Sequence, residues 1–212
     1  MSTFGLMIDR IDDELDRGGT LTSQIEKAIK TAIAAYERRR FWFNEARSVT
    51  FNTVDGQEFY TGSDQSAIPT LLEIDRIKLT ISGSDQIDLE RVPYSELEHD
   101  SSSLTVDEGQ PTSYAYYGQS LRLYPIPDAA YAVRVSGVSE LATLSATTDT
   151  NAWMTDGEAL IRCRAKRELL THVIRDSESA REMAEAESAE LRSMIQANNA
   201  RSSTGRVCAT EF

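Results

Sequence analysis

The sequence predicts an α+β protein, in which helices from both ends of the chain form a helical bundle and a small antiparallel β domain is inserted between them in the sequence. Near both termini, apolar residues recur every three to four positions, as in amphipathic helices. The middle of the chain instead alternates apolar and polar residues between turn signals, as strands do. We therefore expect N-terminal helices over 1–47, the β domain over 48–154, C-terminal helices over 155–197 and a flexible C-terminal tail over 198–212.

Two helices are expected in the N-terminal segment. The first covers Thr3–Asp16, is acidic, and stops at the glycine pair that begins at Gly18. The second covers about Ser23–Glu45, and Ser23 with Glu26 has the spacing of a capping box at its start. Its apolar residues are spaced about four apart, so one face is expected to pack against a core.

The second helix is expected to end in a cationic and aromatic cluster, Arg38-Arg39-Arg40 followed by Phe41-Trp42-Phe43. This is more cationic and apolar surface than an ordinary connector carries, and it indicates that the segment docks on something. Two other interpretations stay open. The arginines and aromatics could hold nucleic acid, on its phosphates and under its bases. Alternatively, Trp42 and one phenylalanine cover the β domain while the arginines lie on the surface or pair with acids.

Six or seven short strands are expected in the β domain. Asp55-Gly56 predicts a hairpin between a strand from Val49 and a return strand at Phe59, and Gly83 marks a second turn. Pro93 predicts the start of a short helix. Tyrosines on these strands are either core and rim residues or a sugar-binding platform; they are Tyr114, Tyr116, Tyr117, Tyr124 and Tyr131.

The last third is expected to be helical after a Ser/Thr/Ala linker over Leu144–Asn151. Thr155 with Glu158 predicts the helix start. One apolar face is expected from Ile161, Ala165, Leu169 and Val173. A break is predicted at Asp176. The tail has no periodicity, so we expect it to order only on a partner.

Charge is distributed unevenly along a chain whose net charge is -12. Residues 23–47 hold six Lys/Arg against three Asp/Glu, whereas residues 48–154 hold five against sixteen. Segments of opposite sign would let neighbouring copies attract each other, although a single charged run is most often solvated surface. The acidic total argues against tight binding of nucleic acid, because phosphate contacts need clustered Lys and Arg.

Motifs of catalysis and ligand binding are missing from the sequence. It has no GxSxG, no GxGxxG and no glycine-rich loop ending in Gly-Lys-Ser/Thr. Its two cysteines and two histidines do not have metal-site spacing. We expect no enzyme activity, no cofactor and no metal. No apolar run approaches the roughly 20 residues of a membrane helix and no signal peptide is visible, so we expect no membrane association.

Five blocks of sequence occur in a recognisable order: YERRRFWFNE, TFNTVDGQEFY, IPTLLEIDRIKL, LRLYPIPD and TNAWMTDGEALIRCRAKRELL. In this order the chain resembles the head-tail connector (adaptor) proteins of tailed bacteriophages, and the resemblance covers roughly residues 20–195.

The resemblance implies a structural protein of the virion, assembled in the host cytoplasm. Such proteins form a homo-oligomeric ring, usually of twelve copies, below the portal protein and above a downstream tail or nozzle protein, and DNA passes through without specific binding. The expected inter-subunit or portal interface residues are Arg38, Arg39, Arg40, Trp42, Arg201, Arg206 and Phe212. The alternative function is a carbohydrate- or surface-binding tail accessory module.

Overall fold

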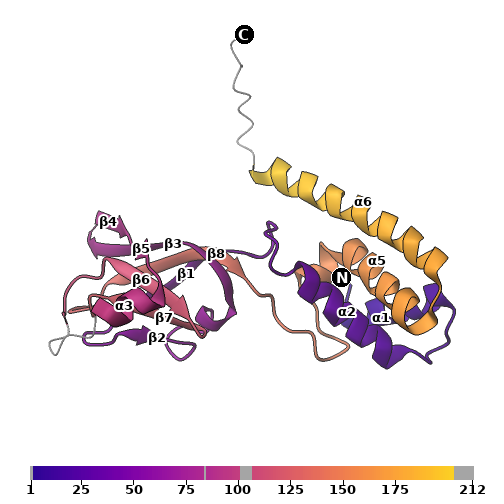
Figure 1. The fold of residues 1–212 in the computed structure, drawn as a ribbon, viewed down its shortest axis with the longest axis horizontal. Helices are drawn as coiled ribbons and strands as arrows, with labels where there is room; N and C mark the ends of the chain where they lie inside the picture. The colour runs from indigo at the N-terminus through magenta and orange to yellow at the C-terminus, as the bar shows by residue number, and fades with distance from the viewer. Residues whose placement is uncertain (1, 84, 101–106, 203–212) are drawn as a thin grey trace, which may run out of the picture. The chain divides into compact units, whose positions relative to one another are not determined.

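The computed structural model describes residues 2–83, 85–100 and 107–202, and the chain divides into two compact units (Figure 1). The helical unit combines the described parts of Met1–Asn44 and Leu141–Phe212. The β unit is Glu45–Glu140. Helices from both ends of the chain thus share one unit, with the strands inserted between them, and the predicted α+β fold is confirmed.

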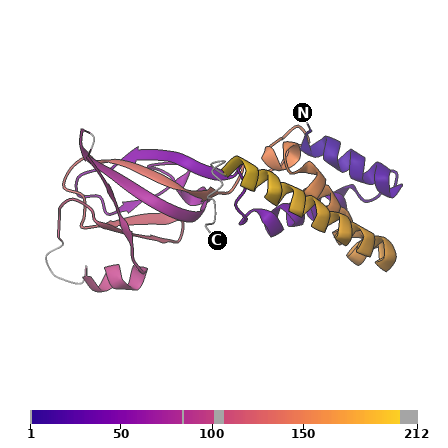
Figure 2. The ribbon, with the colours of Figure 1, turned by 90° about the horizontal axis from the view of Figure 1, so that it is seen from above.

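The helical unit is built around α5. Its elements are α1 (Phe4–Leu15), α2 (Thr22–Tyr36), α4 (Ala152–Thr155), α5 (Glu158–Leu169), the short π-helix η2 (Leu170–Ile174) and α6 (Ser177–Ser202). Both α2 and α6 pack against α5, and α1 contacts α2 and α5 (Figure 2). None of the helices in the described ranges is long and apolar enough to cross a membrane.

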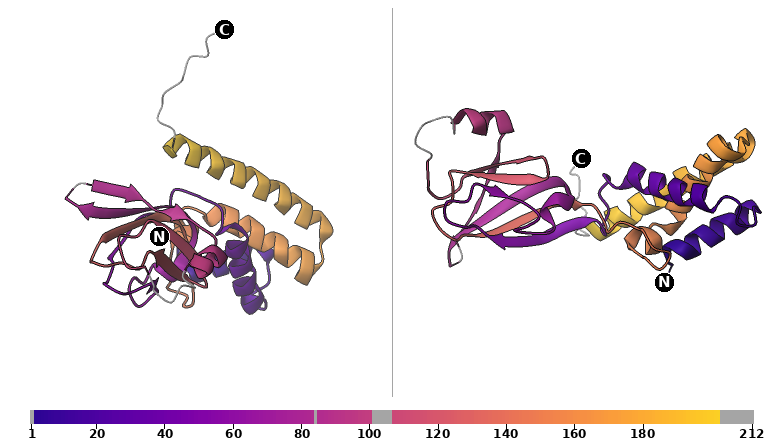
Figure 3. Two further views of the ribbon diagram at one scale, coloured as in Figure 1. Left: turned by 60° about the vertical axis from the view of Figure 1, so that its left-hand side comes forward. Right: turned by 90° about the horizontal axis from the view of Figure 1, so that it is seen from below.

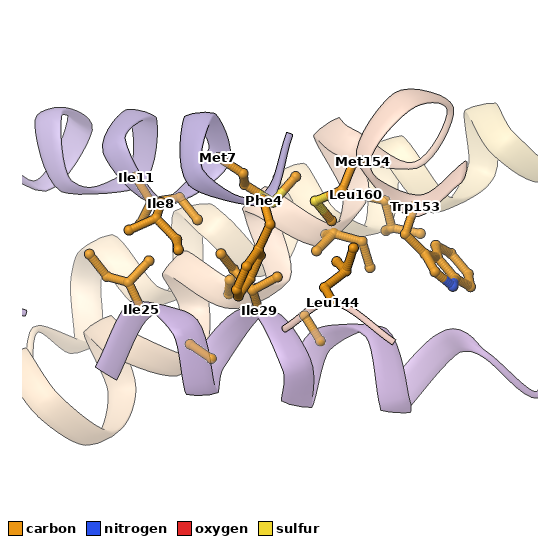
Figure 4. Packing of buried hydrophobic residues seen from close by; sticks show 14 of the residues in the cluster. Phe4, Met7, Ile8, Ile11, Ile25, Ile29, Leu144, Trp153, Met154 and Leu160 are labelled. Carbon is orange, nitrogen blue, oxygen red and sulfur yellow. The ribbon is translucent and has the colours of Figure 1, made fainter. Parts of the chain in front are cut away.

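One apolar core holds the helical unit together. Side chains from α1 and α2 point toward one another and toward the segment after residue 140 (Figure 4). The largest contributors include Phe4, Met7, Ile11, Ile25, Ile29, Trp153, Met154 and Leu160. Each fully buried apolar side chain of this size contributes about 1.5–3 kcal/mol of transfer free energy, so the meeting of amphipathic faces stabilises the bundle.

The β unit consists of two four-stranded sheets (Figure 3). Sheet A has the order β1 (Glu45–Asn52), β8 (Ala132–Ser139), β3 (Leu71–Ser82) and β4 (Asp85–Asp88). Sheet B has the order β2 (Phe59–Tyr60), β7 (Ser120–Tyr124), β6 (Ser113–Tyr117) and β5 (Glu90–Arg91). All pairs are antiparallel except β5–β6. The 3₁₀ helix η1 (Ile68–Thr70) precedes β3, and α3 (Tyr94–Asp100) contacts β6.

A second apolar core lies between the two sheets, and it contains Ile77, Leu79, Val133 and Val135 of sheet A with Tyr60, Tyr114, Leu121 and Leu123 of sheet B. Along β8, Val133 and Val135 are buried while Arg134 between them is exposed. This alternation follows from the two-residue period of a strand. It leaves sheet A with a polar outer face.

The second helix ends at Tyr36, and the prediction that it continues to about Glu45 is wrong. Three consecutive aromatic residues cannot all lie on one helix face, so the chain turns and buries Phe41 in the core instead. The predicted capping box is also wrong. The N-cap is Leu21, without a side-chain hydrogen bond, because the helix begins at Thr22 and Ser23 already lies inside its first turn.

The hairpin predicted at Asp55-Gly56 is wrong, because β1 and β2 belong to different sheets. β1 pairs with β8 and β2 pairs with β7. Gly56 has a φ of 74° and donates its N–H to the carbonyl of Pro127, so this turn carries the chain from sheet A to sheet B. The turn at Gly83 does join paired strands, β3 and β4, as predicted.

The segment predicted as a linker is fixed to the helical unit. Leu144 is buried in its core, and the carbonyls of Thr147 and Asp149 accept hydrogen bonds from the backbone at the start of α1. Asn151 accepts a hydrogen bond from the N–H of Trp153 and so caps α4. Thr155 is therefore the end of α4 and not the predicted N-cap.

The C-terminal helices also differ from the prediction in two places. Val173 was expected on the apolar face but is 43% exposed, because the wider π-helical turn of η2 shifts the register of the face. The break at Asp176 is confirmed, since Arg175 is left-handed and the Asp176 carboxylate caps α6. α6 then continues to Ser202, so the tail prediction is wrong for residues 198–202, and the remainder lies outside the described residues.

Gly137 gives a test of the sheet A register. A Cβ at this position would lie 1.9 Å from the backbone oxygen of Glu73, which is far inside van der Waals contact. We expect Gly137→Ala to lower the free energy of unfolding by about 1–3 kcal/mol or more, because β3 must shift. Gly109→Ala is the control, since a Cβ there meets nothing within 4 Å. Urea unfolding checks both, and an equal effect of the two substitutions would contradict the register.

Candidate interaction surfaces

Residues 37–44, here called the arginine turn, follow α2 and are organised by one buried side chain. Asn44 is 2% exposed. Its Oδ1 accepts the N–H of Phe41 at 2.8 Å, and its Nδ2 donates to the carbonyls of Glu37 at 3.2 Å and Arg39 at 2.7 Å. Each of these hydrogen bonds gives a partner to a backbone N–H or C=O group that has none within the helix. The three arginines of the turn are exposed around this frame.

Aromatic rings anchor the arginine turn to the core of the helical unit. Phe41 and Phe43 stack at 5.4 Å, and Trp153 of α4 meets their edges at 5.7 and 4.9 Å. Trp42 lies edge-on to Phe43 at 5.2 Å. Such geometries are the preferred ones for aromatic pairs. The interpretation that Trp42 and one phenylalanine cover the β domain is therefore wrong, because these rings pack with the helical core.

The far end of α6 meets this turn. The guanidinium carbon of Arg201 lies 4.1 Å from the centroid of the Trp42 ring, which is a cation–π contact. The structure thus places Arg201 beside the turn that carries four other predicted interface residues, although Arg201 lies about 160 positions from them in sequence. These four are Arg38, Arg39, Arg40 and Trp42. Arg206 and Phe212 lie outside the described residues.

A buried carboxylate that the sequence did not reveal holds α6 to α2 and α5. Glu187 of α6 is 5% exposed and accepts hydrogen bonds from the hydroxyl of Tyr36 and from Arg167 at 2.9 Å and Arg164 at 3.5 Å. Burial alone would raise the pKa of Glu187, but the tyrosine hydroxyl and the two guanidinium groups lower it below its ordinary value. Tyr36 directly precedes the arginine turn, so this contact and the Trp42–Arg201 contact both connect α6 to it.

The predicted tyrosine platform does not form as such. Tyr114 is 2% exposed, and Tyr116 donates its hydroxyl to the carbonyls of Ile68 and Leu71 at the edge of the core. Burial raises the pKa of both tyrosines. Two of the five tyrosines are therefore structural, which is the other interpretation that the sequence left open.

A different aromatic cluster is exposed on the β unit. Tyr117 is 69% exposed and stacks on Tyr94 at 5.1 Å. Arg122 lies beneath, with its guanidinium 5.4 Å from the Tyr94 ring and 5.3 Å from the ring of Phe59. Glu58 and Glu98 neutralise this buried cation at 2.5 and 2.9 Å. Together with Ser120, these rings line a surface cavity of 260 Å³.

No group of three or more His, Cys, Asp and Glu side chains that could hold a metal ion occurs within the described ranges. Several ionisable side chains there have structural contacts: Glu58 pairs with buried Arg122, Glu187 pairs with Arg167, and Asp176 caps α6.

The Tyr36–Glu187 bond predicts a pH dependence of stability. Burial, followed by the Glu187 carboxylate, raises the pKa of Tyr36 from 10.0 to about 12. Between these values the unfolded tyrosine ionises while the folded one keeps its proton, so stability is complete below pH 10 and falls as pH rises toward 12. Tyr36→Phe removes this contribution and costs about 1.5–3 kcal/mol at pH 8.

Thermal unfolding of both proteins from pH 8 to 12 checks this expectation. The stability gap between wild type and Tyr36→Phe should shrink as the pH rises through 10–12. Other tyrosines titrate equally in both proteins, so the difference isolates Tyr36. A gap that stays constant across this range would contradict the assignment.

Comparison with known proteins gives the family. The family model described as SU10 adaptor protein matches residues 2–208. The match therefore includes both units and nearly the whole chain. No curated protein matched the sequence. The resemblance inferred from the sequence blocks is confirmed, and this chain belongs to the SU10 adaptor protein family, a family of phage head-tail adaptors.

Proposed function

We propose that this phage adaptor forms a ring of twelve copies below the portal protein, joins it to a downstream tail or nozzle protein, and surrounds the DNA channel. Family membership carries the proposal, because it makes the chain a phage adaptor and a component of the virion. It also implies a structural, non-enzymatic role. The net charge of -12 supports a channel through which DNA passes without being held.

A closed ring of identical copies needs two different surfaces that complement each other. The arginine turn offers the first, with three exposed cations on a frame that Asn44 and the aromatic rings fix. The second surface is the acidic side of α1. Asp9 and Asp13 on α1 and Asp16 just after it are exposed. We infer that the arginine turn of one copy lies against the acidic side of α1 in the next.

The C-terminal tail is proposed as the portal contact. Because Arg201 packs on Trp42, the chain leaves α6 beside the arginine turn. Arg206 follows Arg201 in the sequence by five positions and Phe212 by eleven, and they supply a cation and an aromatic side chain to the portal contact.

A second candidate function is binding of a carbohydrate or another surface by the β unit. The observation that favours it is the exposed Tyr117 ring stacked on Tyr94 beside a 260 Å³ cavity. A glycan screen with the wild type and with Tyr117→Ala tests it. Glycan binding that Tyr117→Ala removes would support this function, and the absence of any bound glycan would reject it.

Charge reversal of the arginine turn tests the ring proposal. We expect Arg38→Glu, Arg39→Glu and Arg40→Glu together to abolish ring formation, because all three cations at the proposed contact become anions. Native mass spectrometry, with and without the portal protein, measures the oligomer. The control reverses Lys27, Arg181 and Arg192, which are exposed elsewhere on the helical unit. Rings that persist in the first variant would overturn the arginine interface.

Truncation after Ser202 tests the tail as a latch. The described part of α6 ends at this residue, so the helical unit should keep its fold and its unfolding temperature. Binding to the portal should weaken by at least tenfold, measured by co-sedimentation or interferometry. Full-strength binding by the truncated chain would show that the latch lies elsewhere.

A further inference from the structure

The outer face of sheet A concentrates the positive charge of an acidic unit. The β unit, Glu45–Glu140, holds six Lys/Arg and sixteen Asp/Glu. Four of the six cations line a single surface hollow of 420 Å³, together with Asp75 and Ser136. We call these four residues the basic face: Arg47, Arg76, Lys78 and Arg134.

At the centre of the basic face, two cations oppose each other across neighbouring strands. Lys78 of β3 and Arg134 of β8 are direct partners in the antiparallel register. Arg134 directs its guanidinium to the backbone carbonyl of Arg47, with Nε and Nη2 both 3.2 Å from the oxygen. Neither side chain has an ion pair with any residue in the described part of the chain.

Like charges directly opposite each other destabilise an antiparallel pair. The remaining two cations of the basic face are only partly compensated, because Arg76 meets Asp88 at 3.8 Å between exposed side chains and Arg47 pairs with Glu45 beside it. In the isolated chain, the hydrogen bonds of Arg134 to the Arg47 carbonyl do not remove the repulsion between the two cations. Carboxylates from outside that lie over Lys78 and Arg134 would remove it.

The other sheet carries a matching acidic surface. Glu90, on the edge strand β5 of sheet B, and Glu96, on the adjacent helix α3, are both exposed. Neither makes an ion pair with a described residue. We call Glu90 and Glu96 the acidic edge. One β unit therefore displays a basic face on one sheet and an acidic edge beside the other.

We propose that the basic face of sheet A binds the acidic edge of a second copy of this chain. Each copy carries a net charge of -12, so identical copies repel unless surfaces of opposite sign meet. A contact between two different faces is heterologous, as a ring requires. This inference rests on the proposed ring and adds a contact between β units to the contact between helical units.

A charge swap in the full-length protein tests the pairing. Lys78→Glu with Arg134→Glu should weaken self-association at least tenfold at low salt, measured by sedimentation velocity. Adding Glu90→Lys and Glu96→Lys to that variant restores opposite signs and should recover association. Lys27→Glu with Arg192→Glu is the control, since it makes the same charge change on exposed residues of the helical unit.

A single substitution separates binding from folding. Lys78→Glu places opposite charges across β3 and β8, so the unfolding temperature should rise by about 1–4 °C while association weakens. A variant that is merely misfolded would lose both. If the unfolding temperature falls, Lys78 and Arg134 do not destabilise the pairing of β3 with β8, and the inference is overturned.

Three other results would also overturn the inference. If association is unchanged in Lys78→Glu with Arg134→Glu while the arginine-turn variant loses its ring, the ring proposal stands and this contact fails. If those two substitutions leave association intact but abolish binding of a 20-base-pair DNA duplex, the basic face is a phosphate site instead. A wild-type chain that is monomeric both alone and with the portal protein would overturn the ring and this contact together.

Discussion

The carboxylate of Glu187 is the constraint on which the arrangement of the helical unit depends. Two guanidinium groups and a tyrosine hydroxyl from α5 and α2 converge on it inside the protein. Such a buried ion group adds little net stability over apolar packing, but loss of one partner leaves a charge uncompensated. Its geometric demand therefore selects one placement of α6, and Arg201 reaches Trp42 because of that placement.

The arginine turn depends on a second polar group of the same kind. The Asn44 side chain accepts one hydrogen bond from a backbone N–H and donates two to backbone carbonyls. The aromatic rings of the turn pack on Trp153 and anchor it to the helical core. A surface that is already ordered loses less conformational entropy on binding. This suits a contact that must form identically in every copy of an assembly.

Both units of this acidic chain have a local surface of positive charge. Both are parts of an acidic chain, and both display a local basic surface: the arginine turn on one and the basic face of sheet A on the other. A uniformly acidic protein would resist packing against itself. In the proposed ring, the local cationic surfaces would form the contacts between copies, and the remaining acidic surface would repel phosphate.

The sequence alone determined what local periodicity encodes. It located α1 to within one residue, the alternating strands of the middle segment, the break before α6 and the α+β class, because helix and strand periods are local properties. It also contained the family resemblance that the family match confirmed. The candidate interface at Arg38–Arg40 and Trp42 was visible as an unusual cluster of residue types.

Only the tertiary structure decided how distant segments satisfy one another. Burial of Phe41 ended α2 at Tyr36, and the partner strands β7 and β8 separated β1 from β2 into two sheets. The Glu187 group joins residues 151 positions apart, and a single glutamate in an acidic helix carries no signal of that role. The opposed Lys78 and Arg134 likewise appear only once the strand register is known, because non-local pairing sets it.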